Sequence, residues 1–127
     1  MRAQEMRSPL GRAQGLGSAK EGVLHWWRQR ISALALIPLS LWFVSEIIAH
    51  LGAPIDAAQR WVGRPLPAIA LILLLIAVFY HGALGLEVVI EDYVETPFAK
   101  LGLIVSVRLA AIVLAAAGIF AVLHMAL

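Results

Sequence analysis

The sequence lacks several features that most small proteins have. It contains no cysteine, which excludes disulfides, thiolate metal sites and cysteine nucleophiles. Charged side chains make up only 14% of its 127 residues, whereas about a quarter of an average globular chain is charged. It has no glycine-rich flavin-binding motif, and no basic patch interleaved with aromatic residues that would indicate nucleic acid as a partner.

Hydrophobic residues are abundant instead. They make up 61% of the chain, and the mean hydropathy is +0.87. A soluble protein of this size has too little interior to hide so many apolar side chains. The composition therefore predicts an integral membrane protein.

Three apolar segments follow a polar start. Each is long enough to cross a hydrocarbon core of about 30 Å as a helix. We expect an all-α membrane protein with a flexible polar extension over residues 1–24. A three-helix membrane domain then spans residues 25–127. Because a chain with three short helices and several ionisable groups inside them is not expected to function alone, we expect its helices to form part of a multi-subunit bundle. The expected helices span about residues 31–51, 66–91 and 100–126.

Basic residues are distributed unevenly between the two ends of these helices. The first 30 residues contain six and the second loop adds Lys100, whereas the first loop contains only Arg60 and Arg64. Loops rich in Lys and Arg remain on the cytoplasmic side. This predicts that the N-terminus and the second loop face the cytoplasm, or the matrix of a mitochondrion.

Ionisable side chains inside membrane helices are rare because removing them from water is costly. His50 and His124 lie near helix ends, where snorkelling to water explains them. Glu87 and Arg108 have similar expected depths in neighbouring helices, so we expect them to form an ion pair. The intramembrane ionisable residues are Glu46, His50, His81, Glu87, Arg108 and His124.

His81 is the exception, because it follows twelve unbroken apolar residues. It has three possible roles: a hydrogen bond to a neighbouring helix, a place in a proton relay, or ligation of a metal or haem iron through a neutral imidazole. At 100° per residue, Asp92 lies on nearly the same helix face, about 16 Å further along. Gly82 and Gly85 leave room beside the histidine for another helix or a flat cofactor.

Arg28 and Arg30 lie at the cytoplasmic end of the first apolar segment. They anchor the positive side of the membrane, and a guanidinium there can also pair with an anionic cofactor group such as a haem propionate.

The segment "HGALGLEVVIEDYV" contains a histidine, ten further residues and then Asp92-Tyr93, and "RISA" opens the first helix at Arg30. With these motifs, residues 25–127 resemble the small hydrophobic membrane anchor subunit of succinate dehydrogenase, respiratory complex II. The resemblance implies that His81 is an axial ligand of haem b, that Tyr93 and Asp92 belong to a quinone site, and that Arg30 or Arg28 lies near the haem propionates.

The resemblance also implies a function and partners. The chain would anchor a flavoprotein subunit and an iron–sulfur subunit to the membrane beside a second membrane anchor subunit, and would help to pass electrons to ubiquinone. No catalytic residue and no activity of the isolated chain are expected. The alternatives are the anchor of a quinol:fumarate reductase and a non-redox structural membrane subunit. The expected location is the bacterial inner membrane, in preference to the mitochondrial one.

Overall fold

A computed structural model gives the arrangement of the chain, and it describes residues 8–10 and 19–127. Most of the N-terminal extension expected over residues 1–24, namely residues 1–7 and 11–18, lies outside the described residues.

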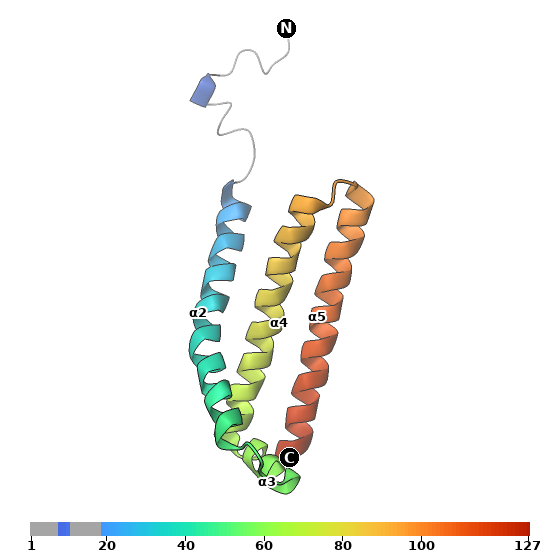
Figure 1. Cartoon of the computed structure of the whole chain (residues 1–127). Helices are drawn as coiled ribbons and strands as arrows, with labels where there is room; N and C mark the ends of the chain where they lie inside the picture. Colours follow the sequence, from blue (N-terminus) through green and yellow to red (C-terminus); the bar gives the residue numbers. More distant parts are fainter. Residues whose placement is uncertain (1–7, 11–18) are drawn as a thin grey trace.

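Three long helices lie side by side, and α4 stands between the other two (Figure 1). They are α2 (Ala19–Ala49), α4 (Pro65–Tyr93) and α5 (Pro97–Ala126), and a short helix α3 (Ile55–Val62) connects α2 to α4. No strand occurs in the part of the chain that the structure describes. Each long helix is long and apolar enough to cross a membrane. The predicted all-α fold with three candidate membrane spans is therefore confirmed.

The helix boundaries follow local chemistry. Pro65 and Pro97 occupy the first turns of α4 and α5, where a missing backbone N–H breaks no helical hydrogen bond. α2 begins at Ala19, well before the apolar segment expected at residue 31. The residues between, AKEGVLHWWRQR, include the strong helix formers Ala, Lys, Glu, Leu, Gln and Arg.

Helix α3 was not predicted, because its eight residues lie in a loop rich in Pro and Gly. Its sequence did carry a helical signal, since Asp56 and Arg60 are four residues apart. Arg60 Nη1 donates a hydrogen bond to Asp56 Oδ2 at 2.7 Å. The two side chains are exposed, so this pair contributes little to stability.

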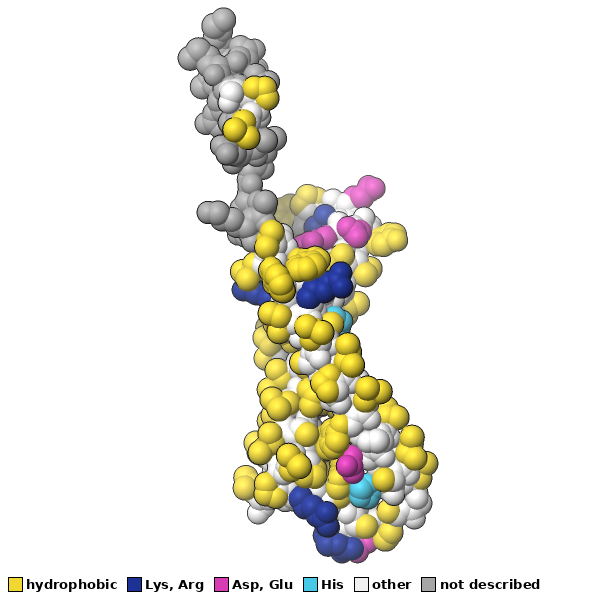
Figure 2. Space-filling view, turned by 90° about the vertical axis from the view of Figure 1, so that its left-hand side faces the viewer, with side chains coloured by type: hydrophobic (Ala, Val, Ile, Leu, Met, Phe, Trp, Pro, Cys, Tyr) yellow, Lys and Arg dark blue, Asp and Glu magenta, His cyan; other side chains and the backbone are white. Residues whose placement is uncertain are grey.

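The N-terminal end of α2 and the α4–α5 loop lie at the same end of the molecule, and α3 and the C-terminus lie at the other (Figure 1). Charged side chains gather towards the two ends, with a hydrophobic stretch between them (Figure 2). This is the layout of a protein whose middle lies in hydrocarbon. The start of α2 therefore lies at the same end as the second loop, as the distribution of basic residues predicts.

The three long helices form a single layer, and few side chains are buried between them. No large side chain among the described residues is completely buried, and many Leu, Ile and Val residues are exposed along all three helices. Helices α4 and α5 approach each other closely at Gly118. A Cβ added there would lie 3.0 Å from Leu75 Cδ1. The open faces fit a chain that packs against other membrane helices.

An ion pair joins α4 to α5 inside the span. Arg108 Nε and Nη2 donate to the two carboxylate oxygens of Glu87 at 2.5 and 2.9 Å. Glu87 is only 4% exposed, whereas the Arg108 side chain is 62% exposed. The predicted pairing of these two residues is confirmed. Its two-pronged geometry is the strong form of an arginine–carboxylate contact.

We predict that Arg108→Ala destabilises the protein, because it leaves a buried carboxylate without a partner. The expected cost is about 1–3 kcal/mol. Replacing both residues, as Glu87→Gln with Arg108→Gln, should recover much of the loss, because two amides can still form a hydrogen bond. Thermal denaturation of the detergent-solubilised protein would measure each variant.

Asp56→Ala with Arg60→Ala is the matched control, because it removes an exposed ion pair of the same charge. It should cost less than about 1 kcal/mol. Equal effects from the two pairs, or single and double variants at Glu87 and Arg108 that simply add, would contradict the coupling.

Candidate functional site

His81 lies in the body of α4 and faces α2. Its Nδ1 is 3.0 Å from the hydroxyl oxygen of Ser32 on α2. The same hydroxyl donates a hydrogen bond to the backbone carbonyl oxygen of Gln29, also at 3.0 Å. Ser32 is only 6% exposed, so water has little access to this contact. The hydrogen-bonding role considered for His81 is therefore present, and it uses only one of the two ring nitrogens.

The two glycines near His81 have different surroundings. A Cβ added at Gly85 would lie 3.7 Å from Gln29 Nε2, so α2 lies close to α4 there. A Cβ added at Gly82 would meet no atom within 4 Å. One glycine therefore accommodates the neighbouring helix, and the other leaves open space beside the histidine.

Two grooves run along α4 and meet at Tyr80 and Arg28. The groove between α2 and α4 has a volume of 430 Å³ and includes Ser32 in its wall. The groove between α4 and α5 has a volume of 380 Å³ and includes Glu87 and Arg108. Apart from these residues and Tyr80, both are lined by apolar side chains. The Arg28 side chain is thus directed to the same side of α2 as the serine that contacts His81.

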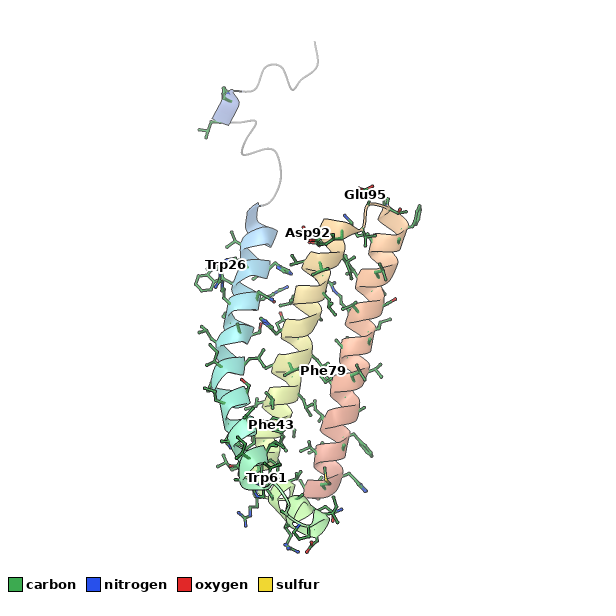
Figure 3. All side chains as sticks on the ribbon, viewed as in Figure 1. Trp26, Phe43, Trp61, Phe79, Asp92 and Glu95 are labelled. Carbon is green, nitrogen blue, oxygen red and sulfur yellow. The ribbon has the colours of Figure 1, made fainter. Side chains whose placement is uncertain are left out.

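Arg30 is directed elsewhere. Its guanidinium carbon lies 5.1 Å from the centre of the Trp26 ring, a cation–π contact. Figure 3 shows Trp26 on the side of α2 that faces away from α4. In the isolated chain, Arg28 rather than Arg30 therefore lies on the His81 side of α2.

Asp92 and Tyr93 end helix α4 beside the α4–α5 loop (Figure 3). Tyr93 is 82% exposed. Neither side chain has a hydrogen-bond partner among the described residues. Lys100 anchors this end by donating to the carbonyl oxygen of Glu91 at 3.1 Å. The phenol and the carboxylate are therefore free to meet a ligand or another protein chain.

The opposite end of the molecule has a separate cluster. The His50 ring donates from Nδ1 to the carbonyl oxygen of Glu46 at 2.8 Å and lies 5.1 Å from the Trp61 ring. Trp61 in turn stacks on Trp42, which joins α3 to α2. His124 stacks on Phe120 within α5. Local contacts therefore account for His50 and His124.

Sequence reasoning missed Ser32 as the partner of His81 and Gln29 as the neighbour of Gly85. The available signal was that Arg28 and Ser32 are four residues apart and so share a helix face. Among the described residues, no three His, Cys, Asp or Glu side chains form a cluster that could hold a metal ion.

Comparisons with known proteins agree with the fold. The family model described as succinate dehydrogenase/fumarate reductase transmembrane subunit matches residues 4–123. A succinate dehydrogenase hydrophobic membrane anchor subunit of Rickettsia bellii is 35% identical over 120 residues, covering 94% of this chain and 96% of the relative. The protein of the same description from Paracoccus denitrificans is 34% identical, covering 94% and 92%.

No solved structure matches the chain. The relatives from Rickettsia and Paracoccus are bacterial, which supports a bacterial membrane as the location. The match extends over nearly the whole chain and includes two candidate membrane spans and all but the last three residues of the third. This chain therefore belongs to the family of succinate dehydrogenase hydrophobic membrane anchor subunits.

Proposed function

We propose that this subunit contributes one axial ligand of haem b and part of the ubiquinone reduction site of succinate dehydrogenase, and so helps electrons pass from the iron–sulfur subunit to ubiquinone. The observation that carries the proposal is His81. It is an imidazole inside a membrane span, held through Nδ1, and its Nε2 has no hydrogen-bond partner among the described residues.

The residues around His81 fit a haem. A neutral imidazole with one free nitrogen is the usual histidine ligand of haem iron. The open space at Gly82 leaves room beside His81 for a flat, largely apolar group, and Ser32, which contacts His81, also lines an apolar groove. When bound, the haem supplies a one-electron redox centre. The other axial ligand would come from the second membrane anchor subunit.

Two arginines are candidates to neutralise the haem propionates. Arg28 lies on the side of α2 that faces α4 and lines both grooves, and Arg30 stacks on Trp26. A guanidinium matches a carboxylate with two parallel hydrogen bonds. The position of Arg28 favours it for this role, and Arg30 is the second candidate.

The quinone site is proposed at the end of α4. The exposed phenol of Tyr93 can donate a hydrogen bond to a quinone oxygen and stabilise the charge that develops there during reduction. Asp92 precedes it in the sequence and can orient the phenol or pass protons from water. Reduction of a quinone takes two electrons and two protons, so a proton route at this end is required.

This assignment gives the subunit an orientation. The end that carries Asp92 and Tyr93 also carries the N-terminal side of α2 and Lys100, which the distribution of basic residues assigns to the cytoplasm. The flavoprotein and iron–sulfur subunits would dock there, because they supply the electrons. Membrane lipid and the second membrane anchor would cover the open helix faces.

We predict that His81→Leu removes the normal haem b signal, because the variant lacks an axial ligand. Reduced-minus-oxidised absorption spectra of membranes that contain the assembled complex would measure it. His124→Leu is the matched control, since that histidine lies at the other end of the molecule, and it should leave the spectrum unchanged. A wild-type spectrum in His81→Leu would refute the haem assignment.

We predict that Tyr93→Phe slows ubiquinone reduction about tenfold or more, because one hydrogen-bond donor to the reacting oxygen is lost. Succinate oxidation with an artificial dye should be unchanged, since the dye bypasses the quinone. Parallel assays of the purified complex with quinone and with dye would test this.

Tyr80→Phe provides the control for the quinone assay. Tyr80 is the other tyrosine of the chain, and it lies in the body of α4, away from the proposed quinone site; Tyr80→Phe keeps the ring that lines the two grooves and removes only the hydroxyl. Its variant should retain normal quinone turnover. Equal losses in both variants, or no loss in Tyr93→Phe, would count against the assignment of Tyr93.

A further inference from the structure

We propose that Ser32 is a positioning residue for the haem ligand. Its hydroxyl oxygen accepts the Nδ1–H of His81, and this hydrogen bond keeps the imidazole in the tautomer whose Nε2 lone pair is free to bind iron. The inference rests on the proposed function, because it assumes that His81 ligates haem.

Counting protons on the serine hydroxyl gives the direction of the hydrogen bond. The hydroxyl has one hydrogen and two lone pairs. It lies 3.0 Å from the Gln29 carbonyl oxygen and 3.0 Å from His81 Nδ1. A carbonyl oxygen can only accept, so the serine hydrogen goes to Gln29. The contact with His81 is then a hydrogen bond only if Nδ1 carries a hydrogen and donates it.

The reverse arrangement satisfies fewer groups. If Ser32 donated its hydrogen to Nδ1, the Gln29 carbonyl and the serine oxygen would face each other without a hydrogen between them. The hydrogen of the neutral ring would then be on Nε2, which would block that nitrogen as a ligand. The arrangement that makes both 3.0 Å contacts favourable is therefore also the one that frees Nε2.

Because the site is buried, the Nδ1–H of His81 depends on Ser32 as its acceptor. A ring that binds iron through Nε2 must carry its hydrogen on Nδ1, and that hydrogen needs an acceptor. Ser32 is 6% exposed and lies within a membrane span, so water cannot easily replace it. Partners that hold the second nitrogen of a metal-binding histidine typically change metal affinity by about 10–100-fold when they are removed.

The chain offers a matched control on the same helix. Ser45 donates to the carbonyl oxygen of Trp42, three residues back, as Ser32 does to Gln29. Ser45 is exposed, and among the described residues it forms no hydrogen bond with a histidine. Ser45→Ala therefore removes the same kind of hydrogen bond within α2 and leaves His81 untouched.

The experiment uses the assembled complex purified from membranes with wild type, Ser32→Ala, Ser32→Thr, Ser45→Ala and His81→Leu. Haem retention is measured by transfer of haem to apomyoglobin, and the haem midpoint potential by spectroscopic redox titration. Ser32→Ala should release haem about 10–100-fold more readily. Its midpoint potential should rise, because a ring that donates no hydrogen bond is a weaker electron donor to iron.

Ser32→Thr keeps the hydroxyl and should restore both values towards wild type, and Ser45→Ala should match wild type. If Ser32→Ala does not assemble, Ser32→Cys preserves the size of the side chain and replaces the oxygen by a poor acceptor. It should then reproduce the early haem release and the raised potential.

The possible failures are distinguishable. Wild-type haem in His81→Leu would overturn the proposed function. Loss of haem in His81→Leu, together with wild-type retention and potential in Ser32→Ala or Ser32→Cys, would overturn only the role of Ser32. A defect in Ser45→Ala equal to that in Ser32→Ala would also overturn it, because the effect would then come from α2 in general.

Discussion

The three-helix layer depends on one constraint: a polar side chain inside a membrane must find its partner within the protein. The central helix α4 meets this constraint in two directions. His81 contacts Ser32 of α2, and Glu87 binds Arg108 of α5. The two α4 residues are six positions apart, about 9 Å along the helix and about 120° around it. These contacts therefore fix the rotation of α4 against both neighbours, since turning the helix would break at least one of them.

The same contacts separate structural from functional roles along α4. The hydrogen bond to Ser32 holds the imidazole of His81 by one nitrogen and leaves the other without a partner among the described residues. The ion pair of Glu87 is satisfied on both carboxylate oxygens, so it is suited to holding helices together. Asp92 and Tyr93 take part in no such contact within the described chain and lie exposed where α4 ends. Within the described chain, His81 therefore uses one of its two ring nitrogens and Glu87 uses both carboxylate oxygens. Asp92 and Tyr93 form no hydrogen bond there through their side chains.

The sequence predicted those features that depend on position along one helix. Hydropathy located the three spans, and matching depths correctly paired Glu87 with Arg108. The contact between Ser32 and His81 depends on how α2 and α4 are rotated against each other, which one helix pattern cannot specify. Helix α3 (Ile55–Val62) was missed because its proline- and glycine-rich flanks resemble a loop. The early start of α2 was missed because hydropathy marks the hydrocarbon span, whereas a helix continues into water wherever its residues favour it. The roles of His81, Asp92 and Tyr93 remain predictions, because they depend on a cofactor and on other subunits.

Pro38 has a consequence for how this subunit can vary. It is the one proline inside α2, where it removes a helical hydrogen bond and allows the helix to bend. Ser32 precedes it, and the tryptophan contact between Trp42 and Trp61 follows it. The part of α2 that follows Pro38 can therefore change its tilt while the part that precedes it stays in contact with His81. A change of tilt after Pro38, such as a change in the first loop would require, would therefore leave the contact between Ser32 and His81 in place.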